Sequence, residues 1–128
     1  MAKSTDLGRI LLVGAGKMGG ALLQSWLEKE TRNPSDIVLV EPSVSRAKYF
    51  RDKYNLFTFE TPEAINTGLG DAIILFAVKP QVMDEVVPLY KTLIRPGQLV
   101  LSIAAGIPIN FFERQLGERV PIVRAMPN

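Results

Sequence analysis

Short apolar runs alternate along this chain with longer stretches in which apolar residues recur at helical spacing. The run Ile10–Val13 is apolar throughout, which is typical of a strand buried on both faces of a sheet. In the stretch that follows, residues 18–30, Met18, Leu22 and Trp26 recur every four residues. This spacing places them on one face of a helix, so the pattern predicts a strand followed by an amphipathic helix.

The alternation continues to the last residues of the sequence. Further strands are predicted at residues 37–40, 56–59, 72–77, 99–102 and 121–125. Helical segments are predicted at residues 43–54 with Ser43 as N-cap, from residue 61, at 82–93 and at 109–116. Pro88 either kinks the segment 82–93 or begins a second helix. Strands separated by helices predict an α/β fold, a doubly wound Rossmann-type domain whose mainly parallel six-stranded sheet has helices on both faces.

Composition excludes several kinds of chemistry. The 128 residues suit one domain, and 47% hydrophobic with 22% charged residues is ordinary for a globular protein. The net charge of +2 is small and scattered, which argues against nucleic-acid binding. Cysteine and histidine are absent, which excludes disulfides, thiol chemistry, histidine metal sites and Ser-His-Asp triads, and no metal site is predicted. The apolar runs are too short for a membrane span or a signal peptide, which favours a cytoplasmic protein without a membrane partner.

The first strand-to-helix turn carries a GxGxxG pattern between residues 14 and 19. In a doubly wound sheet this turn binds the pyrophosphate of a dinucleotide, because the N–H groups and the dipole of the helix N-terminus stabilise negative charge. Gly14 permits the tight turn, Gly16 lets the pyrophosphate approach the backbone, and Gly19 lets the helix pack closely. The candidate cofactor-binding residues here are Val13, Gly14, Ala15, Gly16, Lys17, Met18 and Gly19. A glycine turn without a ligand is the alternative.

The second predicted strand ends at Glu41. A carboxylate there accepts hydrogen bonds from the ribose hydroxyls of an adenine dinucleotide and repels a 2′-phosphate, which favours NADH over NADPH. Ser43, Ser45 and Arg46 lie just downstream and are suited to bind that phosphate, so both NADPH and NADH are candidate cofactors. A solvated charge is the alternative for Glu41. S-Adenosylmethionine enzymes share the glycine turn and the acid, but this chain has no obvious motif that activates an acceptor.

Two more strand ends carry candidate cofactor-binding residues. These residues are Ala77, Val78, Lys79 and Pro80 at the end of the fourth strand, and Ala104 and Ala105 after the fifth. The fourth strand ends beside the glycine loop, where a small Ala77 makes room for a flat ring and Lys79 brings a positive charge. The small residues after the fifth strand expose backbone to the nicotinamide end of a dinucleotide. A solvated lysine in an ordinary strand exit, and small residues that only let a helix pack, are the alternatives. No residue is predicted to be catalytic.

Four segments follow one another along the chain in a specific order. They are Val13–Gly19, Ala77–Gln81, Ser102–Ile107 and Arg124–Asn128. Together they resemble the successive signatures of the pyrroline-5-carboxylate reductases, over essentially the whole chain. The resemblance implies reduction of Δ1-pyrroline-5-carboxylate to L-proline by NADPH or NADH, the last step of proline synthesis. It also implies that the glycine loop binds the pyrophosphate, that residues 77–80 line the nicotinamide ribose, and that residues 104 and 105 lie near the nicotinamide.

The resemblance further implies that, in members of this family, the segment that corresponds to Asn128 is followed by a helical domain. That domain dimerises and supplies most of the substrate pocket. Residues 1–128 are therefore expected to be the dinucleotide-binding domain, inactive alone, of an enzyme that is a homo-oligomer through the absent domain. An asparagine that some relatives place before the third helix is not evident, and Thr61 or Pro62 stands there instead. A non-catalytic nucleotide-binding or regulatory module, and a related reductase with another substrate, are the alternatives.

Overall fold

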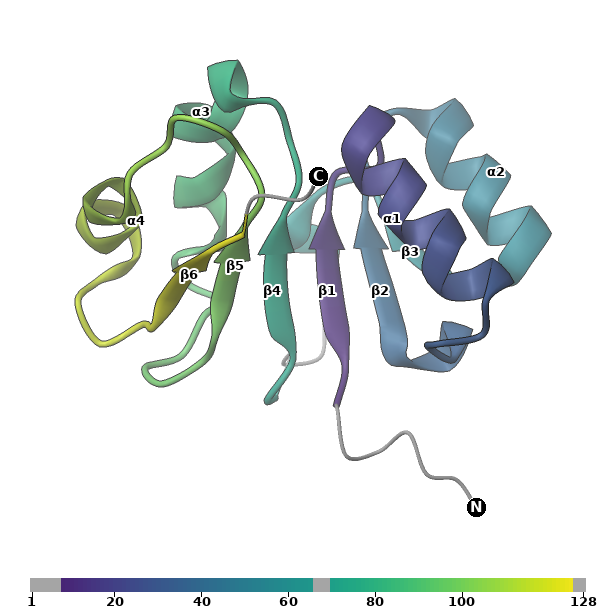
Figure 1. Ribbon diagram of the computed structural model, residues 1–128, viewed down its shortest axis with the longest axis horizontal. Coiled ribbons are helices and arrows are strands. Elements are labelled where there is room, and N and C mark those ends of the chain that lie inside the picture. The colour runs from purple at the N-terminus through teal and green to yellow at the C-terminus, as the bar shows by residue number, and fades with distance from the viewer. Residues whose placement is uncertain (1–7, 66–69, 126–128) are drawn as a thin grey trace.

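The computed structural model describes residues 8–65 and 70–125, and its strands form one parallel sheet (Figure 1). The strands are β1 (Ile10–Val13), β2 (Ile37–Val40), β3 (Phe57–Phe59), β4 (Ile73–Phe76), β5 (Val100–Ser102) and β6 (Ile122–Arg124). Their order in the six-stranded sheet is β3-β2-β1-β4-β5-β6, and every neighbouring pair is parallel. This order is that of a doubly wound sheet, so the predicted fold class is confirmed.

Helices and single 3-10 turns connect the strands. The α-helices are α1 (Lys17–Glu28), α2 (Val44–Tyr54), α3 (Met83–Val86) and α4 (Ile109–Leu116). The 3-10 turns are η2 (Pro34–Asp36), η3 (Pro62–Ala64), η4 (Pro80–Val82) and η5 (Val87–Tyr90). The segment predicted as helical over 82–93 is broken into short pieces, and Pro88 lies in the first turn of η5. Proline has no N–H to donate to the preceding turn, which explains why α3 ends before it.

Alternate side chains of β1 enter two separate cores. Leu11 and Val13 belong to the cluster that contains residues of α3, η5 and α4, whereas Ile10 and Leu12 belong to the cluster that contains residues of α1 and α2. All four side chains are buried. Figure 1 shows α1 and α2 beside the β1–β3 half of the sheet and α3 and α4 beside the β4–β6 half, while each of the two clusters includes residues from both halves. The continuous apolar run of β1 is therefore explained by burial on both of its faces.

The strand order changes direction at β1, which lies between β2 and β4. Ile10 pairs with Ile37 on one side and with Ile73 on the other, so the carboxyl ends of the three strands meet at one edge of the sheet. In open α/β sheets, ligands bind in the crevice outside this edge. The turns that follow β1, β2, β4 and β5 all lie there. Within the part of the chain described, no helix is long and apolar enough to cross a membrane.

Candidate functional site

The turn after β1 contacts the end of β4 so closely that only glycine fits at its first position. Gly14 has φ +99, and its N–H donates to the Val40 carbonyl at 2.9 Å. A Cβ added to Gly14 would lie 2.8 Å from Cγ1 of Val78 and 3.2 Å from the Ala77 carbonyl oxygen. Both the backbone conformation and the close approach therefore require glycine here, as predicted for the first glycine of the pattern.

The third glycine of the pattern is required by packing. A Cβ on Gly19 would lie 2.2 Å from the Gly14 carbonyl oxygen and 3.0 Å from Cβ of Ala77. Helix α1 therefore contacts both the glycine loop and the end of β4, which confirms the prediction of close helix packing. Gly16 differs, because a Cβ there would meet no heavy atom within 4 Å and its φ of −74 is open to any residue. The space beside Gly16 is free for a ligand.

The N-terminus of α1 is suited to bind an anion. Gly16 is the N-cap residue and offers no side-chain cap, and the first turn contains no acidic residue. The first hydrogen bond of the helix is donated by the Gly20 N–H to the Gly16 carbonyl at 2.7 Å. Lys17 and Met18 are exposed. The N–H groups and dipole at this end of α1 thus face the open space beside Gly16, the arrangement that binds phosphates in other proteins.

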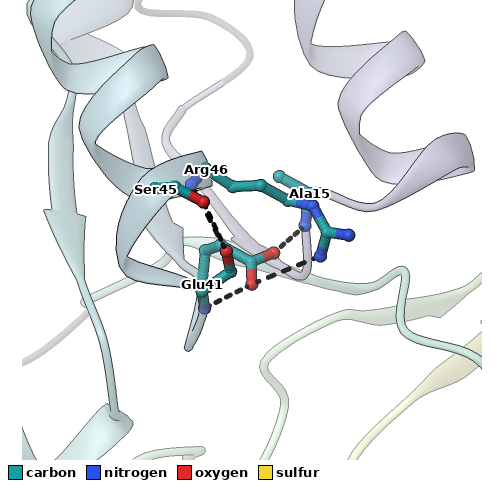
Figure 2. Close-up of polar contacts among 5 residues, drawn as sticks. Ala15, Glu41, Ser45 and Arg46 are labelled. Atoms are coloured by element: carbon teal, nitrogen blue, oxygen red, sulfur yellow. Dashed lines mark hydrogen bonds and ion pairs between the residues drawn. The ribbon is translucent and has the colours of Figure 1, made fainter.

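Glu41, which follows β2, lies between two turns instead of pointing outward. It is 4% exposed, and its Oε1 accepts a hydrogen bond from the Ala15 N–H at 2.7 Å. Its Oε2 accepts from the Ser43 N–H at 2.8 Å and lies 3.9 Å from the nearer guanidinium nitrogen of Arg46. Figure 2 shows the Ala15 N–H and the Arg46 guanidinium on the same side of the carboxylate. The contact between Glu41 and a ribose stays a prediction, whereas its contacts with both turns belong to the protein itself.

The turn from β2 to α2 presents donors on its outer side. Ser43 is the N-cap of α2, and its hydroxyl accepts from the Arg46 N–H at 3.4 Å, so the predicted cap is confirmed. The Ser43 and Ser45 hydroxyls lie 3.2 Å apart, and the Arg46 side chain is 57% exposed (Figure 2). This turn therefore carries two hydroxyls and, 3.9 Å from Oε2 of Glu41, an exposed guanidinium.

The ends of β4 and β5 lie at the same edge of the sheet as the glycine loop. The Ala77 N–H donates to the Val13 carbonyl at 2.8 Å, and the Ile103 N–H donates to the Phe76 carbonyl at 3.2 Å. The predicted site residues of these turns divide by exposure: Ala77 and Ala104 are buried, Val78 is half-buried, and Lys79, Pro80 and Ala105 are exposed. Ala77 and Val78 therefore lie against the glycine loop, while Ala104 and Ala105 lie one strand farther along the same edge.

Sequence reasoning did not identify the role of Ser102. This buried residue ends β5, and its hydroxyl accepts from the Ala104 N–H at 3.3 Å. Its carbonyl accepts from the Ala125 N–H at 2.8 Å. A serine in an otherwise apolar strand was the available signal. Residues 126–128, which end the last motif of the sequence analysis, lie outside the described residues.

Two shallow hollows lie away from the glycine loop. One, at the outer edge of β3, is lined by Ala47, Arg51, Thr58, Phe59, Glu60, Thr61 and Ala64. The other lies at the opposite end of the sheet, beside Ile94 and Val120. Neither is lined by a predicted cofactor-binding residue. Within residues 8–65 and 70–125, no group of three or more acidic residues could hold a metal ion.

Comparisons with known proteins agree with this geometry. The model of the family described as "NADP oxidoreductase coenzyme F420-dependent" matches residues 9–106. Curated pyrroline-5-carboxylate reductases from Mycobacterium leprae and Methanosarcina acetivorans are 33% and 36% identical to this chain. The matches cover 97% and 94% of this chain but only 42% and 44% of those proteins. The chain thus spans less than half the length of these relatives.

Solved structures show the same partial match. A pyrroline-5-carboxylate reductase from Coxiella burnetii aligns with a TM-score of 0.82 at 27% identity, over 95% of this chain and 44% of its own. The Plasmodium falciparum pyrroline carboxylate reductase, solved with NADP bound, aligns with a TM-score of 0.72 at 25% identity, over 94% of this chain and 42% of its own. A prephenate dehydrogenase from A. aeolicus, at 16% identity and a TM-score of 0.74 over 92% of this chain and 41% of its own, shares the fold.

Proposed function

The chain belongs to the family described as "NADP oxidoreductase coenzyme F420-dependent", and we propose that it is the dinucleotide-binding domain of a pyrroline-5-carboxylate reductase. Such an enzyme reduces the imine of Δ1-pyrroline-5-carboxylate to L-proline. The relatives that match nearly the whole chain carry this name, which supports the choice of substrate. Bound NADPH or NADH would supply the hydride, and the residues of this chain would bind and orient the dinucleotide.

One observation carries the dinucleotide proposal. Gly14 and Gly19 are required by contacts within the protein, whereas Gly16 faces open space at the uncapped N-terminus of α1. A glycine that no intramolecular contact requires, beside free helical N–H groups, is what a pyrophosphate site needs. We propose that the N–H groups of the first turn of α1, from Lys17 onward, bind the pyrophosphate.

The nicotinamide end is assigned to the ends of β4 and β5. Ala77 and Val78 lie against the glycine loop, and we propose that the nicotinamide ribose lies beside them. Ala104 and Ala105, one strand farther along, are proposed to lie near the nicotinamide. Exposed Lys79 adds a positive charge at the same edge. None of these side chains is suited to protonate an imine, so the proposal assigns no catalytic residue to this chain.

Substrate binding and oligomerisation are assigned to the segments of the relatives that lie outside their match with this sequence. The curated relatives are more than twice as long as the region they share with this chain. We propose that their other segments hold the substrate and form a homo-oligomer, and that residues 1–128 form one dinucleotide-binding domain. A cytoplasmic location is part of the same proposal.

Two measurements on the purified 128-residue protein test the proposal. Calorimetry is expected to detect binding of NADPH or NADH, because the pyrophosphate site is formed within the chain. Oxidation of NADPH in the presence of pyrroline-5-carboxylate is expected to stay at background. Holding both reactants in near-attack geometry supplies about 7–11 kcal/mol of the barrier reduction, and nothing proposed here holds the substrate.

The alternatives give other results. Binding of S-adenosylmethionine in preference to both dinucleotides would contradict the assignment of the cofactor. Turnover of about 10 s⁻¹, as in an ordinary enzyme, would show that the substrate site lies within these residues. A longer protein from the same gene could bind a dinucleotide well and still fail to reduce pyrroline-5-carboxylate. That result would favour a regulatory module or a reductase with another substrate.

A further inference from the structure

We propose that Glu41 is a positioning residue that fixes the glycine loop for the pyrophosphate, and that it does not select between NADH and NADPH. This inference rests on the proposed dinucleotide-binding function. The four residues involved, Ala15, Glu41, Ser43 and Arg46, are called the Glu41 bridge below. They come from two turns that are far apart in the sequence and adjacent at the sheet edge (Figure 2).

The carboxylate joins the two turns through both of its oxygens. One accepts from the Ala15 N–H at 2.7 Å and the other from the Ser43 N–H at 2.8 Å. Hydrogen bonds to an ionised acceptor are about twice as strong as neutral ones. Ala15 immediately precedes Gly16, the residue beside the free space of the site. The Glu41 bridge therefore fixes the position of the backbone that meets the pyrophosphate.

The same geometry leaves Glu41 poorly placed to contact a ribose. Glu41 is 4% exposed and both oxygens point toward backbone N–H groups. The Arg46 side chain is 57% exposed and its guanidinium lies 3.9 Å from Oε2 (Figure 2), and the Ser43 and Ser45 hydroxyls belong to the same turn. We therefore expect a ribose that reaches this turn to meet the exposed guanidinium of Arg46 before the buried carboxylate. The repulsion of a 2′-phosphate expected from an outward-facing acid is therefore not expected here.

The consequence is a loss of affinity that is equal for all ligands with a pyrophosphate. Glutamine in place of Glu41 keeps the size of the side chain but has one acceptor oxygen, so one of the two N–H groups loses its partner. A hydrogen bond to a charged group lost at the loop corresponds to about tenfold weaker binding. That factor applies equally to NADH, NADPH and ADP, because all three present the pyrophosphate to the same backbone.

The experiment compares Glu41→Gln with Glu113→Gln, which removes the same charge from an exposed position on α4. Calorimetry with NADH, NADPH and ADP gives the three affinities for each protein. We expect Glu41→Gln to lose about tenfold for all three ligands, with the NADH to NADPH ratio unchanged within about twofold, and Glu113→Gln to lose nothing. A loss confined to NADH and ADP, with NADPH unchanged or tighter, would show that Glu41 contacts the ribose 2′-hydroxyl and would overturn the proposal.

Amide hydrogen exchange provides a second test that needs no ligand. At least one of the Ala15 and Ser43 amides should exchange at least about tenfold faster in Glu41→Gln, since glutamine has an acceptor for only one of them. The Val100 amide, which donates to the Pro121 carbonyl in the other half of the sheet, should be unchanged and so exclude global unfolding. Unchanged exchange of both the Ala15 and the Ser43 amides would overturn the Glu41 bridge. If the wild type bound neither dinucleotide, the proposed function would fail, and the exchange rates would still decide whether the bridge exists.

Discussion

The turn after β1 and the turn after β5 lie at the same edge of the sheet, and both contain glycine. In the first, the Gly14 and Ala15 N–H groups donate to Val40 and Glu41, and added Cβ atoms at Gly14 and Gly19 would clash. In the second, the Ala104 N–H donates to the Ser102 hydroxyl at 3.3 Å, and a Cβ on Gly106 would meet nothing within 4 Å.

This difference separates the two ends of the proposed dinucleotide site. The pyrophosphate end is fixed by backbone contacts within the chain, so little ordering is needed when a ligand binds there. The nicotinamide end has the required small residues but few contacts that fix them. Affinity should therefore come mainly from the first turn, and the second turn should tolerate change until another segment or a ligand contacts it.

Gly19→Val should have the largest effect. Its side chain would begin 2.2 Å from the Gly14 carbonyl oxygen, a backbone atom that cannot rotate away. Overpacking typically costs 1–3 kcal/mol, and we expect about 3 kcal/mol or more here because backbone has to move. Urea unfolding, with Gly16→Ala as the control in open space, measures the loss. A change below about 1 kcal/mol would mean that α1 can shift away from the loop.

Gly16→Val should leave the fold intact and remove dinucleotide binding. The added side chain meets nothing in the protein, and it fills the space assigned to the pyrophosphate. Losing two charge-assisted contacts corresponds to at least about a 100-fold loss of affinity. Calorimetry measures the loss, and a Gly106→Ala variant in the second turn, outside the assigned site residues, should lose no more than about threefold. Equal losses for the two variants would remove the contrast between the turns.

The core beneath the second turn should show a steep dependence on pH in alkaline solution. Burial raises the pKa of the Tyr90 phenol, and Glu63 raises it further. Above the unfolded value of about 10, the unfolded chain loses this proton first, so the free energy of unfolding falls by about 1.4 kcal/mol per pH unit. Below pH about 10 the contribution is fully present. Tyr90→Phe should remove this part of the slope in urea unfolding, and an unchanged slope would mean that Tyr90 is not the group responsible.

Gly106→Ala should have the smallest effect. Gly106 has φ +78, a conformation that alanine adopts at a cost of about 1 kcal/mol, but no atom stands in the way of a Cβ. The free energy of unfolding should fall by about that amount, far less than for Gly19→Val. A loss of about 3 kcal/mol, measured in the same urea series, would show that the second turn is as constrained as the first.

Local pattern was enough to predict most of the elements. Helix α4 (Ile109–Leu116) has the predicted bounds, and Ser43 caps α2 as expected. Each of these two predictions depends only on residues within or next to the helix concerned. The segment 82–93 was harder, since its apolar spacing is helical while Pro88 limits each piece to about one turn. The geometry decided between the two alternatives raised for Pro88, in favour of a new turn that begins beside it.

The packing of the glycine loop could be predicted from the sequence, the orientation of Glu41 could not, and dinucleotide binding at this loop stays a prediction. The GxGxxG spacing after an apolar strand identified the loop, and the need for Gly14 and Gly19 followed from it. The orientation of Glu41 did not, because its partner Ala15 is 26 residues away and the direction of a carboxylate depends on packing between two turns. The same sequence is compatible with an acid that faces the ribose and with one that faces the backbone.

The central place of β1 in the sheet has a consequence for the order of folding. Ile10 pairs with Ile37 after a short excursion, but it pairs with Ile73 only after about half the chain has intervened. Contacts of long sequence separation form late and slowly. The unit β1-α1-β2 can therefore assemble early, during synthesis, while the glycine loop still lacks the Ala77 and Val78 backbone and side chains that it packs against. A change that delays the docking of β4 would postpone the moment at which binding is acquired without altering the final affinity.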